Sequence, residues 1–472
     1  QEVSEGHTNY ANTYLYEYKD EPFILLQYSE IFYGLIVGLL GIPIASFFLL
    51  AKFIFPILNF LLWYFFSFFI MRSRKWAIIS SLFLMFGYSL KDNLNIFKQL
   101  DVFSWNADSI NFLVYSRVIN PSLTFPFFFL SLIVLFLFFK RKELKYAIIF
   151  GFLLGVNFYM YFYFWFFLCS IAAFVFLYFL ITRNFKTLKK FLAGLSLAAI
   201  IGSYYIITMF NVAFGGVFEE STAGAYSAFE SSHEMIISKV MIFVSSAFVF
   251  YLLFKYKQKE KLLVSDKFII LALLSTFFVV NQQVITGRLV EEGHFHWYTN
   301  LPIAFLTFSY ILKYFIQKIK IKKIKLTVQY LFIFYFLFYG IGIQASAYKN
   351  KYSQFEEKQK YMSIYSWLNN NSEKESVVLA NNDVSNNLVV YTYNNVYASQ
   401  YASLYSTTPV ERRINAFYTY YYLNSLYLDC DAINLDLASS LIRDYVYFRY
   451  TREGGAVVPD NLKIQLDEAC FL

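Results

Sequence analysis

The chain is short of cysteine, proline, glycine and charged residues. Its 472 residues include 3 Cys, 8 Pro and 18 Gly, and only 15% are Asp, Glu, Lys or Arg, whereas a soluble domain has about 25% charged residues. Three cysteines are too few for a disulfide scaffold. Cys169 lies in an apolar run, while Cys430 and Cys470 lie near the carboxyl end and allow one bridge without requiring it.

Motifs of soluble catalysis are also missing. No P-loop, GxGxxG, paired CxxC, HExxH or GxSxG motif stands in a credible context, so soluble nucleotide chemistry has no support. No cleavable signal peptide is visible, and the chain begins with Gln rather than Met. We expect a natural amino-terminal segment, including a first helix, to precede it.

Apolar and aromatic residues dominate instead. Hydrophobic residues make up 58% of the chain, which contains 58 Phe and 42 Tyr and has a mean hydropathy of +0.46. This composition is typical of an integral membrane protein. The net charge of +8 does not indicate a nucleic-acid partner, because basic loops facing anionic lipid headgroups account for it. Membrane lipids are therefore expected partners.

The connections between apolar runs alternate in charge. Five are basic, and those between them are acidic or neutral. The basic ones are 72–75, 140–145, 183–190, 255–267 and 313–325, and the others are 91–120, 211–234 and 281–300. The positive-inside rule places the first set in the cytoplasm and the second set outside. We therefore expect a polytopic protein of the bacterial inner (plasma) membrane, with its polar chemistry on the outer face.

Apolar segments between these connections are assigned as about ten membrane spans, since a bilayer core needs about 20 apolar residues per helix. They are 45–71, 75–90, 122–139, 145–157, 158–182, 190–212, 236–254, 267–284, 300–316 and 327–344. The apolar block 145–182 is split at Gly155 to Asn157, because one span there would invert the side of every later loop. Ile31 to Pro43 is too short to cross and is predicted to be an interfacial or re-entrant helix.

The predicted fold class is an α-helical polytopic membrane protein with a small carboxyl-terminal α/β domain. Residues 1–44 form an extracytoplasmic segment with the interfacial helix, 45–345 the transmembrane domain, and 346–472 an extracytoplasmic tail. In the tail, 376–380 and 387–393 resemble strands and 411–442 resembles a helix.

The loop 281–298 carries the most distinctive polar side chains. The guanidinium of Arg288 offers a planar fork of N–H donors suited to phosphate, and Glu291 follows three residues later in the same loop. His294 and His296 could neutralise a leaving diphosphate or help to hold a divalent cation, although the His-x-His spacing alone is not specific. The alternative is an aromatic belt at headgroup level with a snorkelling arginine.

Two other outer segments are candidates. Arg117, with Asn120 and a proline next to it, precedes a span and suits anion binding at a helix start, unless the arginine is merely interfacial. Asp20 or Glu21, ahead of the interfacial helix, could act as a general base, with Glu17 nearby as a substrate-binding residue. Exposed carboxylates are common in any polar loop, which is the simpler interpretation.

Together these features resemble the GT-C superfamily of polytopic membrane glycosyltransferases, especially large bacterial GT-C-like membrane proteins. The similarity lies in the carboxylate-bearing segment 17–41, in the Arg117 element and the 286–297 loop at the outer ends of spans, and in the tail beginning with 367–371 and 377–380. It covers most of the chain as architecture. It implies a sugar donor linked to polyprenyl phosphate or diphosphate, taken at the outer leaflet, and a base in the first outer loop, which here is Asp20 or Glu21.

The resulting hypothesis is a membrane glycosyltransferase whose donor phosphate is held by Arg117 and Arg288 with His294 and His296. A flippase or other transporter for lipid-linked oligosaccharides is one alternative, and a non-catalytic assembly protein is another. The scarcity of ionisable residues within the spans counts against an ion-coupled transporter. The sugar and the acceptor are not specified.

Overall fold

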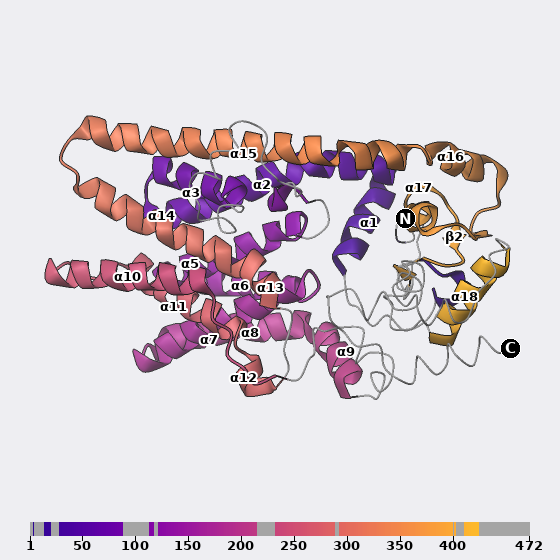
Figure 1. Cartoon of the computed structure of the whole chain (residues 1–472). Coiled ribbons are helices and arrows are strands. Elements are labelled where there is room, and N and C mark those ends of the chain that lie inside the picture. The colour runs from indigo at the N-terminus through magenta and orange to yellow at the C-terminus, as the bar shows by residue number, and fades with distance from the viewer. Residues whose placement is uncertain are drawn as a thin grey trace.

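The computed structural model describes residues 3, 14–19, 28–87, 113–117, 121–214, 232–287, 292–399, 401–402 and 410–423. These residues form a bundle of helices with a small second body at one end (Figure 1). The helices of the bundle are α1 (Tyr28–Leu40), α2 (Ile44–Met71), α3 (Arg74–Phe86), α5 (Phe125–Arg141), α6 (Leu144–Asn157), α7 (Phe162–Ile181), α8 (Phe185–Ile201), α9 (Ser203–Phe214), α10 (Lys239–Lys257), α11 (Val264–Val279), α14 (Leu301–Lys318) and α15 (Lys322–Gln359). Shorter turns are η2 (Tyr16–Tyr18), η5 (Val114–Ser116), α12 (Gln283–Thr286), α13 (Glu292–Phe295) and the π-helical η8 (His296–Asn300).

Four helices of the described residues are long and apolar enough to cross a membrane. They are α2, α7, α10 and the long helix that begins at Lys322. Large apolar side chains such as Phe53, Ile57 and Phe250 point outward from them with more than half of their surface exposed, as lipid-facing residues do. The chain therefore has the character of a helical membrane protein. The full set of ten spans stays a prediction, because several of the remaining helices are shorter.

The predicted division of the apolar block 145–182 is confirmed, since α6 ends at Asn157 and α7 begins at Phe162. The span predicted over 190–212 is not one continuous helix, because α8 and α9 meet at Gly202. The Tyr159 hydroxyl donates to the Ile201 carbonyl at 2.7 Å, and a Cβ on Gly202 would lie 2.5 Å from the Phe158 ring. The Ile201 carbonyl oxygen is therefore bonded to a side chain at the end of α8, and position 202 has no room for a side chain.

The predicted interfacial helix corresponds to α1, which runs across the direction of the bundle rather than along it (Figure 1). Gly41, with φ at +61°, turns the chain out of α1, and Pro43 precedes the first turn of α2. The Tyr33 hydroxyl donates to the Leu123 carbonyl at 2.6 Å. This bond fixes α1 to the segment that leads into α5.

Helices α6 and α8 make the closest packing contact of the bundle. A Cβ on Gly151 would lie 1.9 Å from the carbonyl oxygen of Gly194, and a Cβ on Gly194 would lie 2.2 Å from the carbonyl oxygen of Ala147. Small residues let two backbones approach in this way in membrane helices. Buried amides join other pairs: Asn157 donates to Ser131 at 3.0 Å, and Asn300 donates to the Thr276 carbonyl at 3.0 Å.

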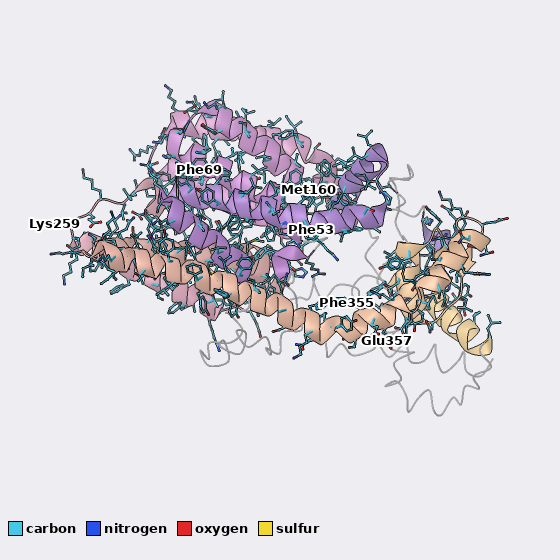
Figure 2. The ribbon with its side chains drawn as sticks, turned by 90° about the horizontal axis from the view of Figure 1, so that it is seen from above. Phe53, Phe69, Met160, Lys259, Phe355 and Glu357 are labelled. Atoms are coloured by element: carbon cyan, nitrogen blue, oxygen red, sulfur yellow. The ribbon has the colours of Figure 1, made fainter. Side chains whose placement is uncertain are left out.

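All five basic connections lie at one end of the bundle and are joined by hydrogen bonds. Ser265 donates to the Ile70 carbonyl at 2.8 Å, and Lys313 donates to the carbonyl of Met71. The other links run from Lys190 to the Lys142 carbonyl (3.0 Å), from Lys267 to the Tyr178 hydroxyl (3.4 Å) and from Lys318 to Glu260 (2.5 Å). In Figure 2, Phe69 and Lys259 mark this end, and Phe355 and Glu357 of α15 lie toward the other.

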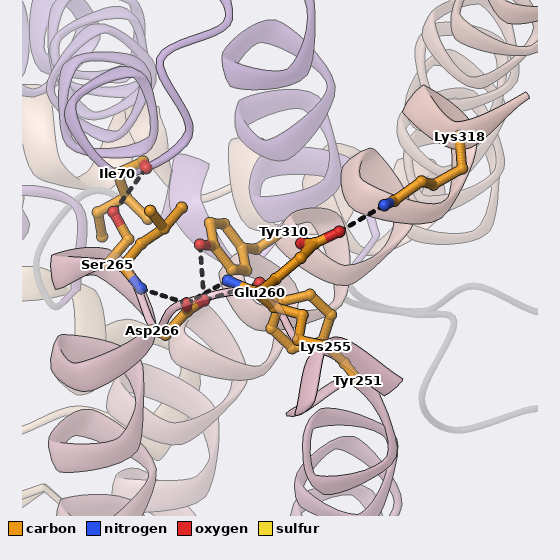
Figure 3. Close-up of polar contacts among 9 residues, drawn as sticks. Ile70, Tyr251, Lys255, Glu260, Ser265, Asp266, Tyr310 and Lys318 are labelled. Atoms are coloured by element: carbon orange, nitrogen blue, oxygen red, sulfur yellow. Dashed lines mark hydrogen bonds and ion pairs between the residues drawn. The ribbon is translucent and has the colours of Figure 1, made fainter. Parts of the chain in front are cut away.

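A buried carboxylate holds three helices together at the basic end (Figure 3). Asp266 of α11 is fully buried and accepts from Lys255 and Tyr251 of α10 at 2.7 Å and from Tyr310 of α14 at 2.8 Å. It also accepts from the backbone N–H of Leu263 at 2.7 Å, which caps α11. Both charges of the Lys255–Asp266 pair are thus hydrogen-bonded as well as paired, which burial requires.

The second body is formed by the tail, namely α16 (Met362–Asn371), β1 (Val377–Val378), α17 (Asn382–Tyr391), β2 (Asn395–Val396) and α18 (Val410–Leu423). The two short strands are parallel, with Val377 opposite Asn395. The prediction of a strand over 387–393 is wrong, because residues up to Tyr391 belong to α17. The Asn381 side chain accepts from the N–H of Val384, and Val384 and Leu388 bury one face at helical spacing.

The first part of the chain packs against this tail. Leu15 is buried in the same apolar cluster as Tyr365, and the N–H of Val396 donates to the Tyr14 carbonyl at 3.0 Å. Lys19 lies 3.5 Å from the Glu375 carboxylate. Residues 14–19, which the sequence places with α1, therefore complete the tail structure.

Candidate functional site

The two histidines of the 281–298 loop lie where α14 begins, at the end of the bundle nearer the tail (Figure 1). The stretch from His296 to Asn300 is π-helical and continues directly into α14. Pro302, in the first turn of α14, has no N–H to donate and its ring would crowd the carbonyl of Tyr298 in a regular helix. The wider π turn accommodates it, and such turns are frequent at functional sites.

His294 lies among three tyrosines, two from the start of α7 and one from the turn that follows His294 in the chain. The Tyr161 hydroxyl and Nδ1 of His294 are 3.2 Å apart. The ring of Tyr163 meets the imidazole edge-on at 4.8 Å between centroids, and Tyr298 lies 5.3 Å away. Tyr161 and Tyr163 stand at the start of α7, directly after the turn that separates it from α6. When Tyr161 donates, the proton of a neutral His294 is on Nε2.

Arg117 is attached to the same group of rings. Tyr115, two residues before it in η5, is fully buried and packs against Phe125 at 5.0 Å, and Phe125 contacts Tyr298 at 6.4 Å. Burial raises the pKa of Tyr115 well above its ordinary value, and Tyr298 beside it raises it further. The Arg117 side chain itself is exposed.

We call Tyr115, Phe125, Tyr161, Tyr163, His294 and Tyr298 the histidine–tyrosine cluster. Its members come from η5, from the starts of α5 and α7, and from the stretch that leads into α14. Segments separated by more than 100 residues thus meet at one end of the bundle. The imidazole of His294 contacts rings of this cluster directly, and Arg117 is linked to it through the backbone from Tyr115.

His296 points to a different neighbour. Its Nδ1 lies 3.4 Å from the Ser238 hydroxyl, and that hydroxyl accepts from the N–H of Met241 at the start of α10. The segment leading into α10 is fixed by Asn281, whose side chain accepts from the N–H of Ile236 at 2.7 Å and donates to its carbonyl at 3.1 Å. The loop before α10 and the loop after α11 therefore form one layer.

The remaining predicted site residues are not all described. Asp20, Glu21, Asn120, Arg288 and Glu291 lie outside the described residues. Glu17 is described, and its carboxylate accepts from Nε of Arg412 in α18 at 2.8 Å, so it is engaged within the tail. Of the predicted residues, the structure thus places His294 in the histidine–tyrosine cluster, Arg117 two residues along the chain from Tyr115 of that cluster, and His296 on the adjoining turn.

Among the described residues, no group of three His, Cys, Asp or Glu side chains is arranged to hold a metal ion. The divalent cation considered from His294 and His296 therefore stays a prediction. The tyrosines that surround His294 could not be found from the sequence, because 42 tyrosines are spread along the chain. The sequence marks Tyr161 and Tyr163 only by their position, because they follow closely after the break in the apolar block at Asn157.

No protein-family model matches the chain, and comparison with curated proteins gives no match.

Proposed function

We propose that the chain is a GT-C-type membrane glycosyltransferase that transfers a sugar from a polyprenyl-phosphate-linked donor to an acceptor at the outer face of the membrane. The observation that supports this most is the histidine–tyrosine cluster, which joins the Arg117 segment to His294 at a single end of the bundle. That end is opposite the five basic connections, which the positive-inside rule assigns to the cytoplasm.

In the proposed reaction, an acceptor oxygen attacks the anomeric carbon and the bond from that carbon to the phosphate oxygen breaks. The acceptor proton goes to the carboxylate of Asp20 or Glu21, and the polyprenyl phosphate leaves with the bonding electrons. Arg117 and Arg288 stabilise the charge that develops on the phosphate. His294 and His296 supply further donors there, and Glu17, Asn120 and Glu291 contribute to substrate binding.

The proposal includes a membrane arrangement. Ten spans in the bacterial inner membrane would leave the tail outside, together with residues 14–19 that pack against it. The donor would enter sideways from the outer leaflet. The acceptor and the sugar are left open.

The test uses the purified protein in lipid nanodiscs with a synthetic short-chain polyprenyl-phosphate hexose. The hexose is transferred to water or to an added acceptor mixture, and the polyprenyl phosphate released in this step is measured by mass spectrometry. Arg117→Gln and His294→Gln are expected to slow release at least tenfold, because each removes a donor to the leaving phosphate. Arg141→Gln, at the basic end, is the matched control and keeps the wild-type rate.

The transporter alternative gives a different result in the same material. A flippase moves a fluorescent lipid-linked sugar between leaflets of a proteoliposome without cleaving it. Movement without cleavage would replace the enzyme proposal by transport. If wild type and Arg117→Gln show neither cleavage nor movement of the lipid-linked sugar, the non-catalytic assembly protein becomes the favoured hypothesis.

A further inference from the structure

The basic end of the bundle contains three cations, at or near the carboxyl ends of three different helices, that are not within ion-pair distance of a described carboxylate. Arg72 follows the last residue of α2, Lys140 lies in the last turn of α5, and Lys313 lies in α14. Among the described residues, none of the three forms an ion pair. We call them the three-cation cluster.

Contacts at the end of α2 bring these side chains together. Lys313 donates to the carbonyl of Met71, the residue before Arg72. Helices α2 and α5 pack against each other, and the charge of Arg72 acts on Lys140. Burial, then Arg72, then Arg141 lower the pKa of Lys140. Lys313 is disfavoured by burial and then by the charge of Arg72, whereas Asp266 attracts it.

The acidic side chains of this end are already engaged. The five basic connections contain three of them, Glu143, Glu260 and Asp266. Glu143 pairs with Lys145 at 2.8 Å, Glu260 with Lys318 at 2.5 Å, and Asp266 with Lys255 at 2.7 Å. Asp266 also accepts from two tyrosines and a backbone N–H (Figure 3). Among the described residues, Arg72 and Lys140 therefore have no carboxylate partner, and Lys313 has only the more distant attraction of Asp266.

We propose that the three-cation cluster binds a phosphate group between the ends of α2, α5 and α14. The guanidinium of Arg72 offers a planar fork of donors that fits two phosphate oxygens, and an ammonium group acts as a point charge on a third. Basic sites between membrane helices bind anionic lipid headgroups in this way. The ligand class is a phosphate monoester or diester, carried by a lipid headgroup or free in solution.

The site is separate from the proposed glycosyltransferase centre. It lies at the basic end, and the histidine–tyrosine cluster lies at the start of α14 and of α7, at the other end of the same helices (Figure 1). A bound phosphate would relieve repulsion among three helix ends without contacting donor or acceptor. Its loss and the loss of sugar transfer can therefore be measured independently.

The experiment titrates delipidated protein in detergent with phosphatidylglycerol, phosphatidylcholine and glycerol phosphate. Binding is followed by native mass spectrometry and by the shift of the thermal unfolding midpoint. The double variant Arg72→Gln with Lys140→Gln is expected to bind phosphatidylglycerol about thirtyfold more weakly, since each basic residue near a headgroup contributes a factor of about five. Lys313 is kept, because its ammonium also caps α2.

Arg183→Gln with Lys189→Gln is the matched control. It removes the same charge from the same end, and Arg183, like Arg72, has a positive φ (53° and 52°) after a helix. This control is expected to bind as wild type does, and Arg72→Lys with Lys140→Arg should retain most of the affinity. A preference for phosphatidylglycerol over glycerol phosphate identifies a lipid site, and equal affinity identifies a soluble phosphate. If the double variant and the control bind equally well, the site does not exist.

Discussion

At the scale of single residues, Asp266 has the largest predicted effect on stability. Replacing it by Asn leaves Lys255 buried without its counter-charge, and breaking a buried pair in this way costs about 3–5 kcal/mol. We expect Asp266→Asn to lower the free energy of unfolding by that amount, measured by SDS titration in mixed micelles. Glu143→Gln, which breaks an exposed pair, should leave it nearly unchanged, because solvent screens that interaction. A double change of Asp266→Asn with Lys255→Met should recover part of the loss, because it removes the unpaired charge and keeps an acceptor for Tyr251 and Tyr310.

Glu260 and Lys318 make a weaker contact whose contribution depends on pH. The hydrogen bond from Lys318 lowers the pKa of Glu260 below 4.5. A carboxyl whose pKa is lower in the folded state stabilises that state above its unfolded pKa and loses this effect as the pH falls through the folded pKa. The difference in thermal unfolding midpoint between wild type and Glu260→Gln should be small at pH 7, begin to decrease near pH 4.5, and disappear once the pH has fallen through the lowered pKa of Glu260. A difference in unfolding midpoint that grows as the pH falls would contradict a stabilising role of the Glu260–Lys318 contact.

Basic residues stand where glycine is usual at helix ends. Arg72, Lys142, Arg183 and Lys259 all have φ between 52° and 58°, and each lies one or two residues after the last residue of a helix. A cation there interacts favourably with the helix dipole. The same residues made the basic connections recognisable in the sequence, which is why the hairpin positions could be predicted.

At the scale of helices, the contact between α6 and α8 gives the clearest test. Gly151→Ala would place a Cβ 1.9 Å from the Gly194 carbonyl oxygen, so the two backbones must move apart. We expect a loss of about 1–3 kcal/mol in the free energy of unfolding. Gly293→Ala is the control, because its nearest neighbour would be 3.8 Å away, and it should be neutral. Equal stability of the two variants would show that α6 and α8 are not in close contact.

Sequence patterns predicted where most helices lie. They did not predict helix breaks and boundaries that depend on individual side-chain contacts. The α6–α7 break was found because charge alternation requires it. The α8–α9 break and helix α17 were missed, because the bond from Tyr159 to Ile201 and the cap at Asn381 are invisible to hydropathy. Similarly, the 281–298 loop was recognised by its histidines, but its π turn and its contact with Tyr161 depend on segments 130 residues apart.

At the scale of the whole molecule, the prediction concerns which end faces the cytoplasm. Single cysteines at Lys259 and at Asn371, in a background with the native cysteines replaced by Ser, are to be labelled in intact cells with a membrane-impermeant maleimide. We expect Asn371→Cys in the tail to react and Lys259→Cys to react only after permeabilisation, because lysine-rich connections stay in the cytoplasm. The reverse pattern would move both the tail and the histidine–tyrosine cluster to the inner face.

Helix α15 is unbroken from Lys322 to Gln359 and continues from the basic end to the tail. Its helical phase therefore sets the angle at which the tail is presented to the rest of the molecule. One residue inserted after Tyr352 would turn the tail, with residues 14–19 packed against it, by about 100° relative to the bundle and raise it by about 1.5 Å. Seven inserted residues would nearly restore the angle at a height increased by about 10 Å. Comparing the two insertions separates a requirement for orientation from a requirement for distance.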